Sequence, residues 1–234
     1  MKVDCSQCAA GTQSVFGALE PHFFERIESH RHAARVPAGH VFCDEGDPVH
    51  AVHCIRQGTV KLVKTGERGD SQVIRLLGPN GIFGLRPLLA GDEFAARAVA
   101  LEECLVCSIP KATVVGLLHQ STAFAAAVMK HLAREIRYSE DLLMVLTQRS
   151  VKRRVADILL LLNGSPVRGD EWAPFPKVHL KRREIAQMVS TTPETLSRTL
   201  AEFARKKLIM VNRKDIVVLD VDGLQRLDRD EGRS

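Results

Sequence analysis

The spacing of hydrophobic residues changes along the chain. Over residues 15–30 they recur every three or four positions, which predicts a helix. Over residues 36–109 short hydrophobic runs, several of them rich in β-branched residues, alternate with single glycines. Many short strands separated by glycine turns are typical of an all-β barrel or roll. Residues 67–70 (Glu-Arg-Gly-Asp) have the composition of a hairpin tip within that region.

After Pro110 the glycines almost disappear and helical spacing returns. Residues 111–119, 122–146 and 151–162 each predict a helix, and residues 163–176 predict a loop. The longest helix carries a seam that alternates in steps of four and three: Ala125, Met129, Leu132, Ile136, Ser139, Leu143 and Leu146. Such a heptad seam packs best against its own copy, so we predict a dimerisation helix, with packing onto its own domain as the alternative. The seam has no acidic residues, which favours a dimer that persists without a cofactor.

Residues 180–207 predict two short helices joined by a polar break at residues 190–192. Thr192 is a favourable N-cap for the second helix, and Pro193 suits its first position. The second helix is expected to bury Leu196, Leu200 and Phe203, and to expose Glu194, Thr195, Ser197, Arg198 and Thr199. This is the helix-turn-helix arrangement, whose second helix enters the major groove of DNA. Residues 209–211 and 216–219 predict a two-stranded wing.

The predicted recognition helix carries groups that suit base edges. Arg198 can donate two hydrogen bonds to guanine, Glu194 can accept one from cytosine N4, and Ser197 can reach several bases. Residues placed to hold the phosphate backbone are Lys181, Arg182, Arg183, Thr192, Arg205, Lys206 and Lys207. The charge distribution agrees, because residues 148–234 hold 18 Lys and Arg against 12 Asp and Glu, whereas the whole chain has a net charge of only +5. We therefore expect double-stranded DNA as a partner.

The composition and motifs of the chain argue against several other classes of protein. Hydrophobic residues make up 45% and charged residues 26% of the 234, as in globular proteins. No apolar run approaches the ~20 residues of a membrane span, and the N-terminus has no signal core, so we expect a cytoplasmic protein. Aromatic residues at 5% argue against a single-strand binder that stacks bases. No P-loop, GxSxG, HExxH or dinucleotide fingerprint is present, so we do not expect an enzyme.

Six short motifs occur along the chain: residues 183–189 (Arg-Glu-Ile-Ala-Gln-Met-Val), 194–198 (Glu-Thr-Leu-Ser-Arg), 37–39 (Pro-Ala-Gly), 46–47 (Gly-Asp), 55–61 (Ile-Arg-Gln-Gly-Thr-Val-Lys) and 107–110 (Cys-Ser-Ile-Pro). Taken together, they resemble those of the CRP/FNR family of bacterial transcription regulators. The resemblance covers nearly the whole chain. It implies an α+β fold with an N-terminal β-roll like a cyclic-nucleotide-binding domain, a long dimerisation helix and a C-terminal winged helix-turn-helix.

The resemblance also implies a division of the chain and a DNA site. Residues 1–14 would be a cysteine-containing arm, 15–121 the sensory roll, 122–147 the dimerisation helix and 148–234 the DNA-binding domain. A homodimer would bind a two-fold symmetric operator, with RNA polymerase as a further partner. Glu194, Ser197 and Arg198 together resemble the FNR branch, which reads a TTGA-type half-site.

The best-known ligand of the family is cyclic AMP, whose buried phosphate needs an Arg-Ser pair as charge-assisted donors. Aligned back from residues 107–109, the matching positions here hold Phe94 and Ala95. The position of the glutamate that would bind the ribose holds Ile82 or Phe83. We therefore expect no cyclic nucleotide.

The FNR branch implies instead a [4Fe–4S] cluster, held by three N-terminal cysteines and one at the end of the roll. Cys5, Cys8 and Cys107 match three of these ligands, but no third N-terminal cysteine follows within residues 9–16. The fourth ligand is left open among Cys104, Cys43, Cys54, a carboxylate such as Asp4, and a histidine. Cys104 is a poor partner for Cys107 if both lie on one strand, because their side chains then face opposite ways.

Two other sensors remain open. Cys5 or Cys8 could form a disulfide with Cys107 or with each other, and haem could be held by one of the early histidines: His30, His32, His40, His50 and His53. Cys43, Cys54 and Cys104 are expected to be small buried hydrophobic residues. Cys5 and Cys8 lie in a short polar arm, so we expect that neither is buried in a hydrophobic core. The function predicted is a regulator that responds to oxygen or redox state; a module that binds a partner protein without reading DNA is the rival.

Overall fold

The computed structural model describes residues 8, 13–67, 69–163, 180–212 and 216–227. The chain divides into two compact units, one of residues 1–70 and 74–139, the other of residues 71–73 and 140–234. The first unit is built mainly of strands and the second mainly of helices, which confirms the predicted α+β class.

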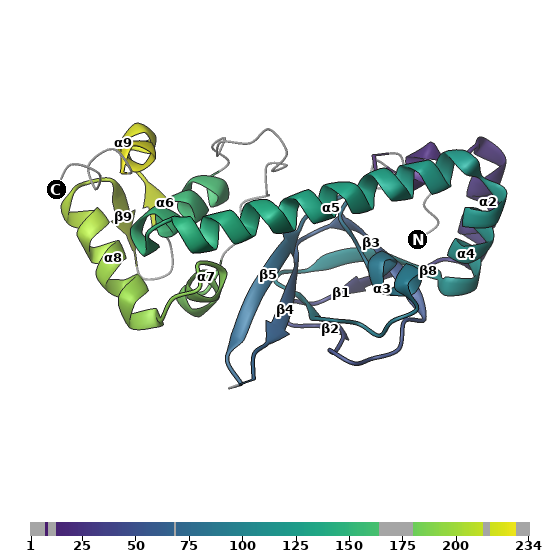
Figure 1. The fold of residues 1–234 in the computed structure, drawn as a ribbon, viewed down its shortest axis with the longest axis horizontal. Coiled ribbons are helices and arrows are strands. Elements are labelled where there is room, and N and C mark those ends of the chain that lie inside the picture. Colours follow the sequence, from purple (N-terminus) through teal and green to yellow (C-terminus); the bar gives the residue numbers. More distant parts are fainter. Residues whose placement is uncertain (1–7, 9–12, 68, 164–179, 213–215, 228–234) are drawn as a thin grey trace. The chain divides into compact units, whose positions relative to one another are not determined.

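The first unit is a β-roll made of two sheets, with strand orders β1-β8-β3-β6 and β2-β7-β4-β5 (Figure 1). The strands are β1 (His32–Val36), β2 (Val41–Cys43), β3 (Ala51–Gln57), β4 (Val60–Thr65), β5 (Ser71–Leu77), β6 (Ile82–Phe83), β7 (Arg97–Ala100) and β8 (Cys104–Pro110). β8 pairs antiparallel with both β1 and β3. The predicted hairpin tip at residues 67–70 does join two neighbouring strands, β4 and β5.

Helices precede and follow the strands of the roll, and a short one, α3, lies between β6 and β7. They are the 3₁₀ turn η1 (Val15–Ala18), α2 (Pro21–His30), α3 (Leu85–Ala90), α4 (Lys111–Gln120) and α5 (Thr122–Gln148). The single helix predicted over residues 15–30 is wrong, because the chain breaks before Pro21. Proline disfavours helical backbone in the residue before it, and Glu20 is extended with φ −66° and ψ 147°. Helix α3 was not predicted; it lies between Gly84 and Gly91, which both have positive φ.

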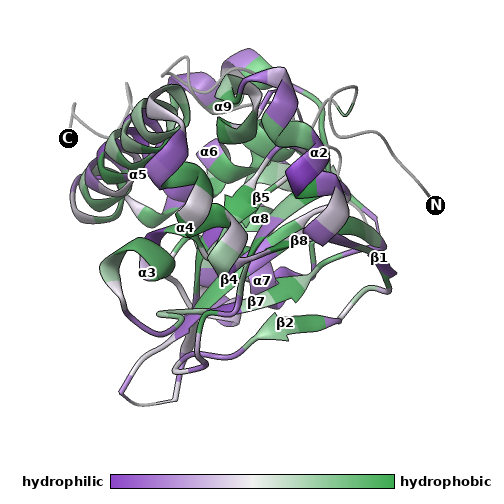
Figure 2. Ribbon diagram, turned by 90° about the vertical axis from the view of Figure 1, so that its right-hand side faces the viewer, coloured by the Kyte–Doolittle hydropathy of each residue, from purple (hydrophilic) through white to green (hydrophobic). Residues whose placement is uncertain are grey.

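The core of the roll is hydrophobic and includes the first part of α5. The strands are mostly hydrophobic in colour, whereas α5 shows hydrophobic and hydrophilic bands (Figure 2). Phe124 of α5 is fully buried and stacks on Phe16, with 5.4 Å between ring centroids. Further along α5, Glu135 forms an ion pair with Arg75 of β5, and the Arg75 guanidinium lies 4.5 Å from the centre of the Tyr138 ring. These contacts hold residues 122–139 against the roll.

The second unit is a winged helix-turn-helix, as predicted. Its elements are α6 (Val151–Leu162), α7 (Arg182–Met188), α8 (Pro193–Arg205), β9 (Ile209–Val211), β10 (Ile216–Val218) and α9 (Val221–Arg226). The wing strands pair antiparallel with Met210 opposite Val217. Helix α9 was not predicted, although the Asp220 side chain caps its first turn by accepting a hydrogen bond from the Gly223 amide at 2.8 Å.

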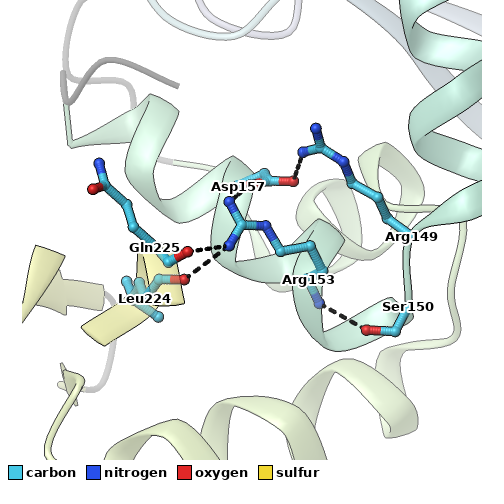
Figure 3. Close-up of polar contacts among 6 residues, drawn as sticks. All are labelled: Arg149, Ser150, Arg153, Asp157, Leu224 and Gln225. Carbon is cyan, nitrogen blue, oxygen red and sulfur yellow. Dashed lines mark hydrogen bonds and ion pairs between the residues drawn. The ribbon is translucent and has the colours of Figure 1, made fainter. Parts of the chain in front are cut away.

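A buried carboxylate joins α6 to its neighbours in this unit (Figure 3). Asp157 forms ion pairs with Arg149, just after α5, and with Arg153, whose Nη2 lies 2.9 Å from Asp157 Oδ1. Arg153 Nη1 also donates to the carbonyl oxygens of Leu224 at 3.3 Å and Gln225 at 2.7 Å. The cluster therefore ties α6 to α9 and to the junction with α5.

Within the described ranges, no single helix is both long and apolar enough to cross a membrane. Helices α4 and α5 meet that test of length and composition only as a pair, and they are bent by 112° at their junction.

Candidate functional site

The recognition helix α8 begins where the sequence predicted. The Thr192 hydroxyl accepts a hydrogen bond from the Thr195 amide at 3.2 Å, and Pro193 occupies the first helical position. Leu196, Leu200 and Phe203 are buried, and α7 packs beside α8. An N-cap satisfies one of the free amides at a helix end, and apolar burial fixes the rotation of the helix about its axis. Both together determine which side chains α8 presents to solvent.

The polar side chains on the first turns of α8 are mostly exposed. Glu194, Ser197 and Arg198 point to solvent, and Arg198 Nη2 donates to Thr195 Oγ1 at 3.3 Å. The prediction that Thr199 is exposed is wrong: its side chain is buried and its hydroxyl donates to the Thr195 carbonyl at 3.0 Å. Position 199 lies beside the buried Leu196 and Phe203 around the helix, so a short hydroxyl that bonds the backbone fits there.

Basic side chains surround this helix. The six predicted phosphate-binding cations, all exposed, are Lys181, Arg182, Arg183, Arg205, Lys206 and Lys207. Lys206 Nζ lies 3.2 Å from Glu202 Oε1, an exposed pair that DNA phosphate can replace. The first three residues open α7, where the Lys181 amide donates to the Glu184 carboxylate at 2.8 Å. The two sets thus lie at the start of α7 and the end of α8.

The predicted seam of α5 is exposed for much of its length. The fractional exposures of Met129, Ile136 and Leu143 are 65%, 61% and 61%, and Ser139 is also exposed. Leu132 and Leu146 are partly buried. Three large apolar side chains are therefore exposed in a row along one face of α5, a larger apolar surface than a helix usually leaves in water.

The described cysteines are all buried and none forms a disulfide. This confirms the expectation for Cys43, Cys54 and Cys104. It contradicts the expectation for Cys8, which is only 7% exposed and packs with the hydrophobic core of the roll. Cys8 is therefore part of the packed roll. Cys5 and Asp4 lie outside the described residues.

Cys104 and Cys107 face opposite sides of β8, as predicted. Cys107 lies opposite Cys54 of β3, whereas Cys104 lies opposite Val36 of β1. The Cys104 thiol donates to the carbonyl oxygens of Thr59 at 3.5 Å and Glu102 at 3.3 Å. Its sulfur also occupies the space where Gly58 would carry a Cβ, at 2.6 Å. Cys104 therefore does not share a site with Cys107.

Cys107 lies among charged groups. Burial raises the pKa of its thiol, while the positive charges of Arg31 and Arg56 lower that pKa and a charge on Cys8 raises it. Arg31 Nη1 lies 3.8 Å from Cys107 Sγ. No group of three His, Cys, Asp or Glu side chains arranged to hold a metal ion occurs within the described residues.

The opposite face of the same sheet points into the roll. His53 of β3 stacks on Phe83 at 4.6 Å between ring centroids, and its Nδ1 is 2.9 Å from Ser108 Oγ. Phe42 of the other sheet packs against both rings, at 5.9 and 5.4 Å. Burial lowers the pKa of His53 to about 4, so it is a neutral core histidine at physiological pH. Phe94, at the position of the cyclic-nucleotide arginine, is buried as well.

Sequence reasoning missed the electrostatic surroundings of Cys107. Arg31 and Arg56 were not singled out, since they stand 76 and 51 residues from Cys107 in the chain and only the strand pairing brings them together. A basic residue inside an otherwise apolar strand, such as Arg56 after Ile55, is a signal that could have been noticed.

Comparison with known proteins supports the same architecture. Residues 33–121 match the family model of the cyclic nucleotide-binding domain, and residues 153–227 match that of the Crp-like helix-turn-helix domain. The transcriptional regulatory protein Btr of Bordetella pertussis is 28% identical over 225 residues, which cover 95% of this chain and 92% of that protein. The fumarate and nitrate reduction regulatory protein of Escherichia coli is 24% identical over 227 residues, covering 96% and 90%. The structure of FixK2 from Bradyrhizobium japonicum superposes with a TM-score of 0.69 at 22% identity, covering 84% of this chain and 96% of that one.

Proposed function

Because the chain belongs to the CRP/FNR family of DNA-binding transcription regulators, whose members are not enzymes, we propose that it binds a palindromic operator with TTGA-type half-sites. It does so as a homodimer, in response to oxygen or redox state. The observation that carries the proposal is the set of exposed side chains on the capped first turns of α8: Glu194, Ser197 and Arg198. RNA polymerase is proposed as a further partner.

Each half of the dimer would insert α8 into one major groove. The Thr192 cap fixes where the helix starts, and the buried Leu196 and Leu200 turn the base-reading side chains outward. The basic residues at the start of α7 and the end of α8 would hold phosphates on both sides of the groove. Two half-sites must lie about one DNA turn, ~34 Å, apart to match a two-fold dimer. The exposed seam of α5 is the proposed dimer surface.

Fluorescence anisotropy tests the operator. A duplex with two TTGA-type half-sites in palindromic order is compared with one in which the half-sites are scrambled. Tight, salt-sensitive binding to the palindrome alone is expected, with a stoichiometry of one dimer per duplex. Equal affinity for both duplexes would remove the specific operator, and a monomer in analytical ultracentrifugation of the cofactor-free protein would remove the permanent dimer.

For the sensor we propose a [4Fe–4S] cluster held by Cys5, Cys8 and Cys107 with a fourth ligand. Two observations support it: Cys8 and Cys107 are both buried in the roll, and the guanidinium groups of Arg31 and Arg56 would balance the negative charge of a thiolate-ligated cluster. Cys104 does not fit as the fourth ligand, because its thiol is committed to backbone carbonyls on the other face of β8. A bound cluster would supply oxygen-sensitive redox chemistry.

A thiol–disulfide switch is the second candidate, favoured by the burial of both Cys8 and Cys107 in the roll unit. Two thiols would lose two protons and two electrons to an oxidant such as a peroxide, and one S–S bond would form. Either sensor would act where Cys8 packs on the roll, and loss or oxidation of the site would repack the roll against α5. The spacing of the two recognition helices would change as a consequence.

Anaerobic purification separates these sensors. We expect iron and acid-labile sulfide in stoichiometric amounts and an absorbance spectrum that bleaches in air. No metal after anaerobic reconstitution would exclude the cluster; a Cys8–Cys107 disulfide found by mass spectrometry after mild oxidation would then establish the switch. A haem absorbance band would contradict both.

A further inference from the structure

Arg198 is exposed on the recognition helix, yet its guanidinium has a fixed partner. Arg198 Nη2 donates a hydrogen bond to Thr195 Oγ1 at 3.3 Å, which is the one polar contact of that side chain among the described residues. Residues three apart on a helix face each other, and helical side chains point back toward the N-terminus. The contact therefore directs Arg198 toward the first turn of α8, the end of a recognition helix that contacts base edges.

Thr195 is itself held by the cap of the helix. The Thr195 amide donates to Thr192 Oγ1 at 3.2 Å, and the Thr192 hydroxyl donates to Thr195 Oγ1, also at 3.2 Å. A β-branched side chain has few χ1 rotamers, so these contacts keep the Thr195 oxygen in one place. Arg198 is thus connected to the N-cap of α8 through a single hydroxyl group.

The Thr195 hydroxyl can hold Arg198 and still leave it able to read a base. A hydroxyl oxygen has two acceptor sites, and the donors on Thr192 and Arg198 occupy one each. A guanidinium has five N–H groups, so one bond from Nη2 leaves its second hydrogen and both Nη1 hydrogens for guanine O6 and N7. A carboxylate in the same place would take two parallel N–H bonds and compensate the positive charge.

We propose that Thr195 is a positioning residue for base reading, whose hydroxyl orders the Arg198 guanidinium in the free protein. This inference rests on the proposed operator and concerns the one guanine in each TTGA half-site. An arginine side chain has many rotamers, and one that is already ordered loses less conformational entropy when it binds. The effect is confined to the guanine contact, so it changes specificity rather than general affinity for DNA.

Two palindromic duplexes isolate the guanine contact. One carries two TTGA half-sites, and the other carries TTAA, in which an adenine–thymine pair replaces each guanine–cytosine pair. The ratio of the two Kd values, measured by fluorescence anisotropy on the anaerobically purified full chain, reports how well guanine is read. Thr195→Val removes the hydroxyl but keeps the amide that Thr192 caps. We expect this variant to lower the ratio about threefold to tenfold, roughly the factor that one net hydrogen bond contributes.

Two further variants distinguish positioning from a structural role. Thr195→Ser keeps the hydroxyl, so it should keep a ratio near that of the wild type. The matched control is Thr199→Val, the same change one helical turn further along α8. The Thr199 hydroxyl donates to the Thr195 carbonyl and does not contact Arg198, so the ratio should be unchanged. In an Arg198→Ala background, Thr195→Val should lower the ratio no further, because the group that it positions is absent.

The outcomes separate this inference from the proposed function. If the wild type binds the TTGA and TTAA duplexes equally, guanine is not read and both fall. If the wild type prefers TTGA and Thr195→Val keeps that preference, or weakens both duplexes alike, the operator stands and the positioning role is overturned. An equal fall of the ratio in Thr195→Ser or in Thr199→Val overturns it as well. Chemical denaturation checks folding, and should Thr195→Val not fold, Thr195→Ala takes its place with the same expectations.

Discussion

The recognition helix α8 and the cysteines of the roll differ in how their functional groups are placed. On α8 the groups are exposed, adjacent in sequence and fixed by one cap and one buried stripe. The described cysteines of the roll are buried and distant in sequence, and strand register places Cys54 opposite Cys107. The exposed groups can be replaced with little cost to folding, whereas the buried groups cannot. Substitutions should therefore separate into effects on stability and effects on binding.

The largest effect on stability is expected at Asp157. Asp157→Ala leaves the buried Arg153 without its carboxylate, and breaking a buried ion pair from one side costs about 3–5 kcal/mol. Chemical denaturation measures the free energy of unfolding. The control is Glu202→Ala, which removes more exposed pairs with Lys152 and Lys206 and should cost under about 1 kcal/mol. Equal losses in the two variants would contradict the distinction between buried and exposed groups.

His53 predicts how the stability of the roll depends on pH. Burial lowers its pKa from 6.5 to about 4, so the unfolded chain binds more protons between these values. The stability due to neutral His53 is complete above pH 6.5 and is lost as the pH falls toward 4, by about 3 kcal/mol. Unfolding measured from pH 7 to 4.5 should show this loss in the wild type and a shallower one in His53→Leu. Parallel curves would show that His53 is not the titrating group.

Arg198 tests the exposed set. Arg198→Ala removes a bidentate contact with guanine and should weaken binding to the TTGA palindrome by about 1–3 kcal/mol, roughly 5- to 150-fold. Binding to random DNA and the unfolding free energy should change little, because the side chain is exposed. The control Arg205→Ala should weaken both duplexes alike and reduce the salt dependence by about one counterion. Equal loss on both duplexes in Arg198→Ala would remove its role in reading bases.

Thr192 has a stabilising role although it is exposed, because its side chain caps the recognition helix. Thr192→Ala should cost about 1 kcal/mol of stability through the lost hydrogen bond to the Thr195 amide. Thr192→Ser keeps the acceptor oxygen and should retain most of that stability. Thermal unfolding compares the two; if serine destabilises as much as alanine, the cap is not the cause.

The sequence predicts α8 better than the roll, because α8 depends on local signals and the roll depends on long-range pairing. Local signals, such as the Thr192-Pro193 start and the spacing of Leu196 and Leu200, suffice for α8, and only Thr199 was misplaced. The roll was predicted as a class from its glycines and short runs. Its register was not, because the partner of Cys107 depends on pairing across more than 50 residues. The burial of Cys8 could not be predicted either, since nothing in its polar neighbours indicates contact with a core.

We propose that the redox state of the roll controls the affinity of α8 for its operator. The most direct test measures the Kd for the TTGA palindrome by fluorescence anisotropy on one anaerobically purified sample, before and after exposure to air, with random DNA as the reference. We expect air to change the Kd for the palindrome and to leave the Kd for random DNA unchanged. An unchanged Kd for the palindrome, in a sample that lost its cluster or formed its disulfide, would show that the roll does not control DNA binding in this way.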